Sequence, residues 1–132
     1  MTKEELIARN KKFILEVLTL TESLPQNRIY DSLVRQIVRS SSSVGANYRA
    51  ACRAKSSADF INKLKIVEEE ADESSFFLDL FYDLDKGHNK ERIKTILKES
   101  NELVSIYSAS VITSKKKLSE SKNSNSKIGD RK

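Results

Sequence analysis

The chain has 132 residues, 33% of them charged, with three glycines, one proline, no tryptophan and a single cysteine, Cys52. This length fits one domain, the composition favours helices over a sheet, and a lone cysteine excludes an intramolecular disulfide and suits a reducing compartment. The formal net charge is +5, and residues 115–132, with seven Lys or Arg against two acidic residues, contain all of that excess. We therefore expect a neutral bundle over residues 1–114 and a disordered basic tail over 115–132.

The beginning of the sequence lacks the apolar core of a signal peptide. The longest uncharged stretch, residues 103–114, is too short and too rich in Ser and Thr to cross a bilayer. We expect a cytoplasmic protein that has no membrane partner.

The first predicted helix covers residues 2–24. The Thr2 hydroxyl can cap its first turn, and Glu5, three residues later, completes a capping box. Pro25 ends the helix, because the residue before a proline is disfavoured in the helical conformation. One side of this helix is apolar, and its residues are Leu6, Phe13, Val17, Leu20 and Leu24.

The second predicted helix covers residues 28–54 and has apolar or small residues at alternating steps of four and three: Tyr30, Val34, Ile37, Ser41, Val44, Tyr48 and Ala51. A run of small residues, 40–46, interrupts its centre and is read either as a loop or as part of one continuous helix. We favour the continuous helix, since the spacing keeps its phase across the run. Gly45 would then allow close approach of another helix, from the same chain or from another subunit.

The third predicted helix covers residues 57–85, with Ser56 as its cap. Its inward side is predicted to contain Phe60, Leu64, Val67, Ala71, Ser74, Leu78 and Phe81. Four further apolar residues lie off that side and predict an oligomer interface, or else a wide monomer core: Ile66, Phe76, Phe77 and Leu80.

A turn at Gly87 precedes the fourth predicted helix, residues 89–114, whose apolar side contains Ile93, Leu97, Ser100, Val104, Tyr107 and Val111. Four long helices joined by short loops predict an all-α, antiparallel, up-down-up-down four-helix bundle.

Residues suited to catalysis or metal binding are scarce. The only histidine, His88, is predicted to lie in a turn, and the consecutive acidic residues of 68–73 point in all directions from a helix. No phosphate-binding loop or paired cysteine motif is present. We predict no catalytic residue, metal site or cofactor, and therefore no enzyme.

Basic residues of the second helix form a candidate nucleic-acid-binding surface: Arg35, Arg39, Arg49, Arg53 and, beyond the helix end, Lys55. Their spacing places the arginines on the outer side of the helix, where they could lie along a phosphate backbone. The alternative is a hydrated or salt-bridged surface, because residues 56–85 contain nine acidic residues against two lysines.

Two stretches of the sequence resemble a bacterial family: SSSVGANYRAACRAKSSADF, residues 41–60, and KLKIVEEEADESSFFLDLF, residues 63–81. These are the four-helix bundle proteins first named for genes inside 23S rRNA intervening sequences. The chain is also similar to the accessory bundle proteins of diversity-generating retroelements. The resemblance implies a left-handed bundle that assembles as a ring, typically a pentamer, without known enzymatic activity. Its retroelement relatives engage nucleic acid and a reverse transcriptase.

Asn47 matches the family pattern, and we expect it to make a structural hydrogen bond near the turn between the second and third helices. Many relatives have Glu-Gly three and four residues after this asparagine, whereas this chain has Ala50 and Ala51. No role of that glutamate is therefore carried over to this chain.

Together these features predict a non-catalytic, homo-oligomeric bundle, a pentamer, that binds RNA or DNA through repeated arginines. The alternative is a scaffold for a protein partner, with no role in nucleic-acid binding.

Overall fold

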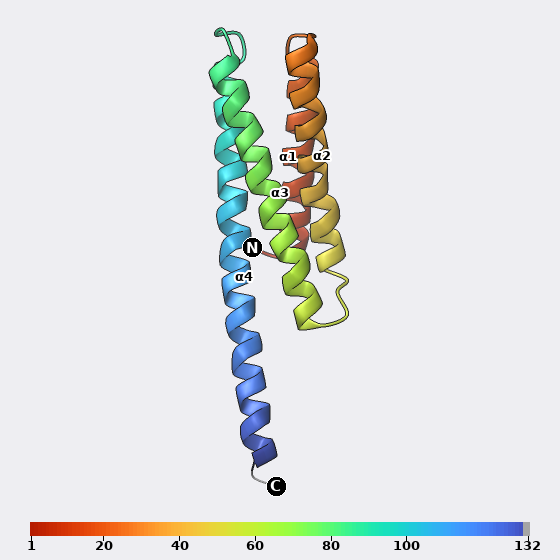
Figure 1. Ribbon diagram of the computed structural model, residues 1–132, viewed down its shortest axis with the longest axis vertical. Coiled ribbons are helices and arrows are strands. Elements are labelled where there is room, and N and C mark those ends of the chain that lie inside the picture. Colours follow the sequence, from red (N-terminus) through yellow and green to blue (C-terminus); the bar gives the residue numbers. More distant parts are fainter. Residues whose placement is uncertain (131–132) are drawn as a thin grey trace.

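The computed structural model describes residues 1–130, with side chains described through residue 124. Within this range the elements are α1 (Lys3–Glu22), α2 (Arg28–Ala51), α3 (Ser57–Leu84) and α4 (Lys90–Asp130). Each short connection turns the chain back, so that successive helices lie side by side (Figure 1). Contacts between α1 and α4 complete the bundle. The predicted all-α four-helix bundle is confirmed, and its handedness stays a prediction.

Local capping explains where the helices begin. Thr2 and Glu5 form the predicted capping box at α1, and the Ser56 hydroxyl accepts a hydrogen bond from the Asp59 backbone N–H at α3 (3.1 Å). Before α4, Gly87 has a φ of +105°, a conformation that residues with a side chain rarely adopt. The first three helices begin and end within three residues of the predicted positions.

Helix α2 is continuous through its run of small residues, as the phase of the pattern predicts. A Cβ atom placed on Gly45 would lie 2.7 Å from Cδ1 of Ile14, so the missing side chain lets α1 approach α2. On the other side of α2, the Ser40 and Ser74 hydroxyls lie 2.8 Å apart and join α2 to α3. The small residues therefore serve close packing within one chain.

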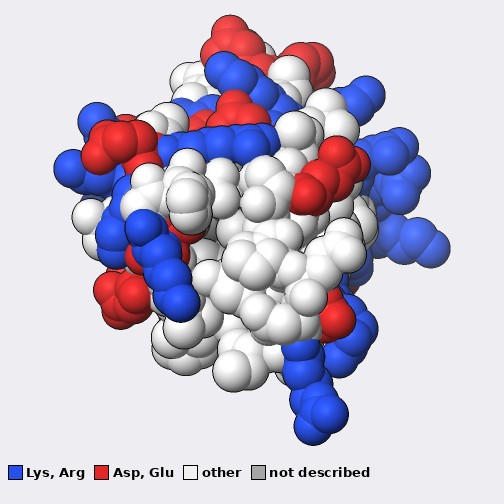
Figure 2. Space-filling view, turned by 90° about the horizontal axis from the view of Figure 1, so that it is seen from above, with Lys and Arg blue, Asp and Glu red and all other residues white. Residues whose placement is uncertain are grey.

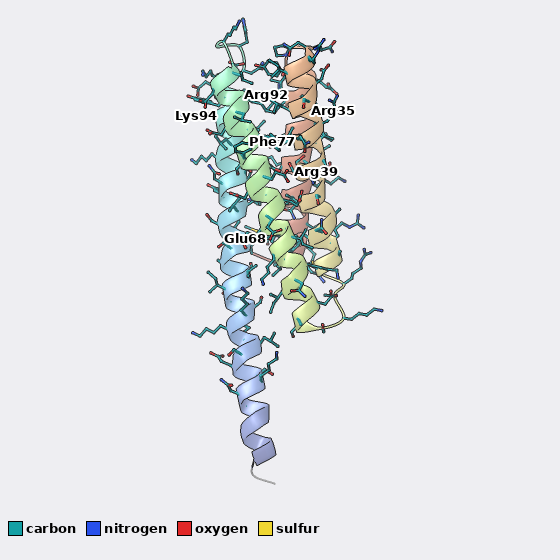
Figure 3. The ribbon with its side chains drawn as sticks, in the orientation of Figure 1. Arg35, Arg39, Glu68, Phe77, Arg92 and Lys94 are labelled. Atoms are coloured by element: carbon teal, nitrogen blue, oxygen red, sulfur yellow. The ribbon has the colours of Figure 1, made fainter. Side chains whose placement is uncertain are left out.

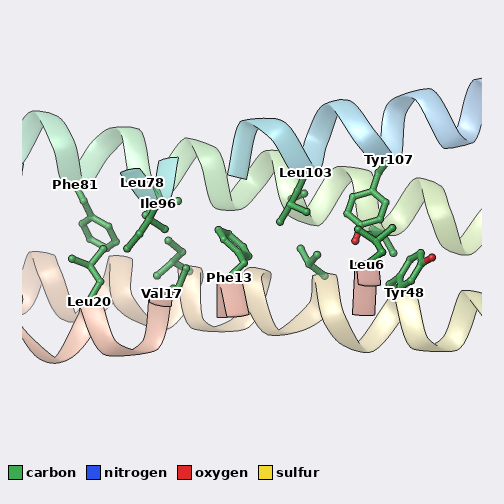
Figure 4. Close-up of a cluster of buried hydrophobic side chains, with 14 of the residues drawn as sticks. Leu6, Phe13, Val17, Leu20, Tyr48, Leu78, Phe81, Ile96, Leu103 and Tyr107 are labelled. Carbon is green, nitrogen blue, oxygen red and sulfur yellow. The ribbon is translucent and has the colours of Figure 1, made fainter. Parts of the chain in front are cut away.

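The core consists largely of the predicted apolar sides of the four helices. The prediction was wrong by one position in parts of α3 and α4, where Ile61, Ile96 and Leu103 are buried while the predicted Phe60, Leu97 and Val104 are half-buried, as is Val34 of α2. Phe13, Val17 and Leu20 of α1 are fully buried, and they face buried residues of α3 and α4 (Figure 4). Ser75 and Ser100 are also buried, and their hydroxyls lie 2.7 Å apart between α3 and α4. A buried hydroxyl with a partner avoids most of the cost of leaving water.

One buried polar contact was not anticipated. Asn10 of α1 is 1% exposed, and its side-chain oxygen accepts a hydrogen bond from the Tyr107 hydroxyl of α4. Burial raises the pKa of Tyr107, and burial also raises the pKa of the neighbouring Tyr48 to about 12. The side-chain nitrogen of Asn10 has no hydrogen-bond partner among the described residues. The phenol is therefore the one described group that forms a hydrogen bond with the side chain of Asn10.

Replacing Tyr107 by Phe should lower the free energy of unfolding by about 1–3 kcal/mol, because Asn10 then stays buried without a partner. Combining Tyr107→Phe with Asn10→Leu should recover most of that loss, since both polar groups are then gone. Urea denaturation of the wild type, both single variants and the double variant measures the coupling. A double variant as unstable as the sum of the two single changes would contradict this role for the contact.

Helix α4 differs from the prediction at its C-terminal end. We expected a disordered tail from residue 115, whereas α4 continues to Asp130 and extends beyond the other three helices (Figure 1). No proline or glycine lies between His88 and Gly129, and a helix already nucleated in the bundle extends at little cost. Of the predicted tail, Arg131 and Lys132 lie outside the described residues. None of the described helices is both long enough and apolar enough to cross a membrane.

Candidate nucleic-acid interface

The five basic residues predicted to bind nucleic acid all lie on the surface. Arg35, Arg39 and Arg49 are exposed on α2, and Arg53 and Lys55 are exposed in the connection to α3. Arg35 and Arg39 lie about one turn apart on α2 (Figure 3). All five basic residues are therefore at the surface, but their neighbours differ.

Arg39 is already engaged within the bundle. Its guanidinium donates hydrogen bonds to Glu70 (2.9 Å) and Glu73 (2.5 Å) of α3, and its side chain is half-exposed. The hydrogen bond to Glu73, opposed in part by desolvation, raises the pKa of Arg39 above its ordinary value. The salt-bridged alternative considered for the arginines therefore describes Arg39.

Replacing Arg39 by Ala should leave the affinity for RNA within about twofold of wild type, because this guanidinium neutralises carboxylates and not phosphates. The same change should cause a small decrease in melting temperature, since it breaks an exposed contact between α2 and α3. Fluorescence anisotropy with a labelled RNA and thermal denaturation measure the two effects. A tenfold or greater loss of affinity would show that Arg39 leaves its carboxylates to bind the RNA.

Arg49, Arg53 and Lys55 differ from Arg39, because none of them makes an ion pair within the part of the chain that the structure describes. The nearest acidic residue along the chain, Asp59, contacts Lys63 instead, at 2.6 Å. The Lys63 hydrogen bond, opposed by desolvation, lowers the pKa of Asp59, so this carboxylate stays charged and engaged. Three basic side chains without a close ion-pair partner therefore lie at the turn between α2 and α3, where the charge of Lys55 also contributes to the lowered pKa of Asp59.

Helix α4 passes the same end of the bundle. A hollow of about 420 Å³ lies between the start of α3 and α4, and Phe60 and Lys117 are among its lining residues. A second hollow, of about 440 Å³, has Phe60, Lys55 and Lys3 among its lining residues. Phe60 is half-buried and belongs to both. Basic residues from α1, from the α2–α3 turn and from α4 therefore surround one aromatic ring.

We call this end of the molecule the basic end, and its exposed basic residues are Lys3, Arg49, Arg53, Lys55, Lys115, Lys116, Lys117 and Lys122. Glu4 and Glu5 of the first turn of α1 are also exposed at this end. Four of these lysines project from α4 where it leaves the bundle, in a segment whose described side chains include only one acidic residue, Glu120. At the opposite end, acidic and basic side chains surround a mainly uncharged area (Figure 2). The surface charge is therefore unevenly distributed along the bundle.

The sequence predicted the surface arginines and the basic tail as separate features, but it did not predict that they lie at the same end of the bundle. The sequence separates Lys55 from Lys117 by 61 residues, and only the packing of α3 along α4 places both beside Phe60. Lys3 was not singled out, because a lysine in a first helical turn carries no distinctive signal. The basic end is therefore a product of tertiary structure.

The predicted interface residues of α3 fall into two groups. Phe76 is 58% exposed and Ile66 is 42% exposed, whereas Phe77 and Leu80 are half-buried. Phe77 packs against the core, and its ring contacts that of Phe76 edge to face, with centroids 5.4 Å apart. The wide-core alternative therefore fits Phe77, and an outward surface remains at Phe76.

Asn47 makes a hydrogen bond of a different kind from the one predicted. Its side-chain nitrogen donates to the Ser43 backbone oxygen (3.0 Å) and to the Ser43 hydroxyl (2.7 Å), one turn earlier in α2. The contact is structural, but it lies within the helix and does not reach the turn. Its effect is to hold the side chain of Asn47 against α2.

The described residues contain no group of three or more His, Cys, Asp and Glu that could hold a metal ion. His88 is exposed in the turn before α4.

Comparisons with known proteins agree with this fold. A family model described as 23S rRNA-intervening sequence protein matches residues 3–109. Among solved structures, a protein of unknown function from the S23 ribosomal protein family of Bacteroides thetaiotaomicron is 30% identical to this chain. That match has a TM-score of 0.74 and covers 84% of this chain and 98% of the other. No curated protein matches the chain.

Proposed function

Because the chain belongs to the 23S rRNA-intervening sequence protein family, we propose that it is a non-catalytic, self-assembling bundle that binds RNA or another nucleic acid through its basic end. The observation that supports this function is the convergence of free basic side chains from three segments around Phe60. We place the protein in the cytoplasm and give it no cofactor. We also propose that five copies assemble as a ring, as the resemblance to the families named above implies.

The chemistry of the basic end suits a phosphate backbone. Lysine and arginine side chains that neutralise phosphates release condensed counterions, and this release supplies most of a sequence-independent affinity. Phe60 offers part of an aromatic face between Lys55 and Lys117, and single-stranded nucleic acids stack their bases on such rings. A single-stranded or looped segment therefore fits this surface better than a regular duplex.

Self-assembly would strengthen a weak contact of this kind. Each copy offers only a few basic side chains, but several copies held in one particle bind a long nucleic acid with a raised effective concentration. The exposed ring of Phe76, 58% accessible, supports assembly, because large apolar groups at a surface commonly mark a partner site.

A protein-interaction scaffold is the second candidate function, and the exposed α3 surface around Phe76 favours it. The two candidates differ in their response to salt. If the basic end binds phosphates, the logarithm of the RNA affinity should fall linearly with the logarithm of salt concentration. Anisotropy titrations with a labelled single-stranded RNA at several salt concentrations measure this slope, and no binding even at low salt would leave the scaffold as the better account.

A further inference from the structure

Two surfaces of the bundle lack a partner within the chain, and their chemistry is complementary. The first, which we call the α1 groove, is an open hollow of about 700 Å³ between α1 and α4. The second, which we call the α3 face, is the outward side of α3 around Phe76. Helices α1 and α3 lie across the bundle from one another, and their backbones do not approach closely within the described chain, although their core side chains face each other (Figure 4). The two surfaces therefore point in different directions.

The α1 groove has an apolar interior and a basic rim. Ile96 of α4 is 3% exposed and lies at its base, while Leu15 of α1 is 53% exposed and forms part of its wall. The rim contains Lys11, Lys12 and Arg92 against one acidic residue, Glu16. Glu16 and Lys12 are at the limit of an ion pair, with 4.0 Å between nitrogen and oxygen. The rim therefore has a net positive charge.

Ion pairs next to the groove hold α1 and α4 in place. Arg9 of α1 donates hydrogen bonds to Glu99 (2.8 Å) and Glu102 (2.6 Å) of α4. The hydrogen bond to Glu99, opposed in part by desolvation, raises the pKa of Arg9. Charged, bidentate contacts of this kind fix geometry well. The groove is therefore a feature of the folded chain and does not depend on a partner to form it.

The α3 face has the opposite chemistry. The Phe76 ring is 58% exposed, and exposed acidic residues lie four positions before it and three and seven positions after it: Asp72, Asp79 and Asp83. Residues at these spacings are neighbours on a helix surface. From Ile66 to Asp85 the chain contains no lysine or arginine. An aromatic group surrounded by carboxylates is thus matched to an apolar groove with a basic rim.

We propose that the α3 face of one copy binds the α1 groove of the next copy, with Phe76 entering the groove beside Leu15 and Ile96. Asp72 and Asp79 then face the lysines and Arg92 of the rim. This inference rests on the proposed self-assembly and specifies how it occurs. Each contact joins two different surfaces, so every copy uses both, and a closed ring leaves neither surface free.

The α3 face and the α1 groove lie at similar positions along the bundle axis, which supports a closed ring. Phe76 lies eight residues before the end of α3, about 12 Å along the helix axis, and Ile96 lies six residues after the start of α4, about 9 Å. Leu78, Val17 and Ile96 lie at the same level of the core (Figure 4). Neighbouring copies with parallel axes could therefore meet with little shift along the axis. A ring requires this, because a repeated shift would produce a helical filament.

The test uses two variants that each damage one surface, Phe76→Asp for the α3 face and Leu15→Asp for the α1 groove. Both side chains are more than half exposed, so circular dichroism should report an unchanged helical fold. Each variant alone should dissociate at concentrations at least about 30-fold above those of wild type, as for a residue central to an interface. An equimolar mixture should form a two-chain species, because Leu15→Asp retains an intact α3 face and Phe76→Asp retains an intact groove.

Each outcome of light scattering on these samples is decisive. A multi-copy wild type, two single-copy variants and a two-chain mixture would support the proposal. If the wild type assembles and either variant does so equally well, or if the mixture stays single-copy, the interface is wrong while assembly stands. A wild type that is single-copy at every concentration would contradict the assembly itself. Should either aspartate unfold the chain, Phe76→Ser and Leu15→Ser replace the pair.

Discussion

Replacing Arg49, Arg53 and Lys55 together by alanine should weaken the binding of a single-stranded RNA by about 50-fold at about 0.15 M salt. These side chains are exposed and make no ion pair within the described residues, so each is free to neutralise a phosphate. Each lost phosphate contact removes about 0.7 from the salt slope of a single-stranded complex, so the slope should fall by about 2. Anisotropy titrations over a range of salt concentrations measure both quantities.

A matched variant separates the basic end from overall charge. Lys86, Lys94 and Lys98 are exposed and lie toward the opposite end of the bundle, at and after the α3–α4 turn. Replacing these three by alanine lowers the net charge by the same amount. The affinity should then change far less than in the basic-end variant. Equal losses in the two variants would mean that nucleic acid responds to total charge and not to this site.

Replacing Phe13 by alanine should lower the free energy of unfolding by about 3–5 kcal/mol. Phe13 is 0% exposed and lies at the centre of the cluster formed by all four helices (Figure 4). Its loss removes apolar contacts and leaves a cavity that rigid neighbouring helices fill only in part. Urea denaturation at a fixed protein concentration measures the change.

The control for this prediction is Ile112→Ala on α4, where the side chain is 65% exposed. That change should alter the free energy of unfolding by no more than about 0.5 kcal/mol. If Phe13→Ala were as mild as Ile112→Ala, the four helices would not share the core described above.

The pattern of the sequence was sufficient to predict the helices and most of the core. The alternating steps of four and three in α2 and α3 identify the buried sides, and capping residues identify the helix starts. The same spacing in α1 reaches position 10 between Leu6 and Phe13, and the structure buries Asn10 there. A polar residue on the buried side of a helix signals an internal hydrogen bond, but its partner, Tyr107, is known only from the packing of α1 against α4.

The surfaces were harder to predict, because they depend on distances between helices. The spacing of the arginines predicts the same outer side of α2 for Arg39 and Arg49. In the structure the two side chains differ by part of a turn around the helix axis, so that Arg39 lies beside Glu70 and Glu73, whereas Arg49 lies beside α1. The α1 groove exists because α1 and α4 pack less closely than the other neighbouring helices. Neither feature follows from the periodicity of one segment.

The proposed ring and the proposed binding surface are compatible. Copies with parallel axes would place every basic end, and every projecting segment of α4, on the same side of the particle (Figure 1). The α3 face and the α1 groove would be covered, while Arg53, Lys55 and Lys117, which line neither surface, would stay exposed. Assembly would thus gather the basic ends into one surface, which a long nucleic acid could contact at several points.

Light scattering of the wild-type chain during size exclusion, with and without a single-stranded RNA at low salt, tests the central claim most directly. One copy has a mass of 15.0 kDa. We predict a protein mass several times that value and a further increase when RNA is added. A particle that has the mass of one copy at every concentration, and that elutes separately from the RNA, would contradict both the assembly and the proposed binding.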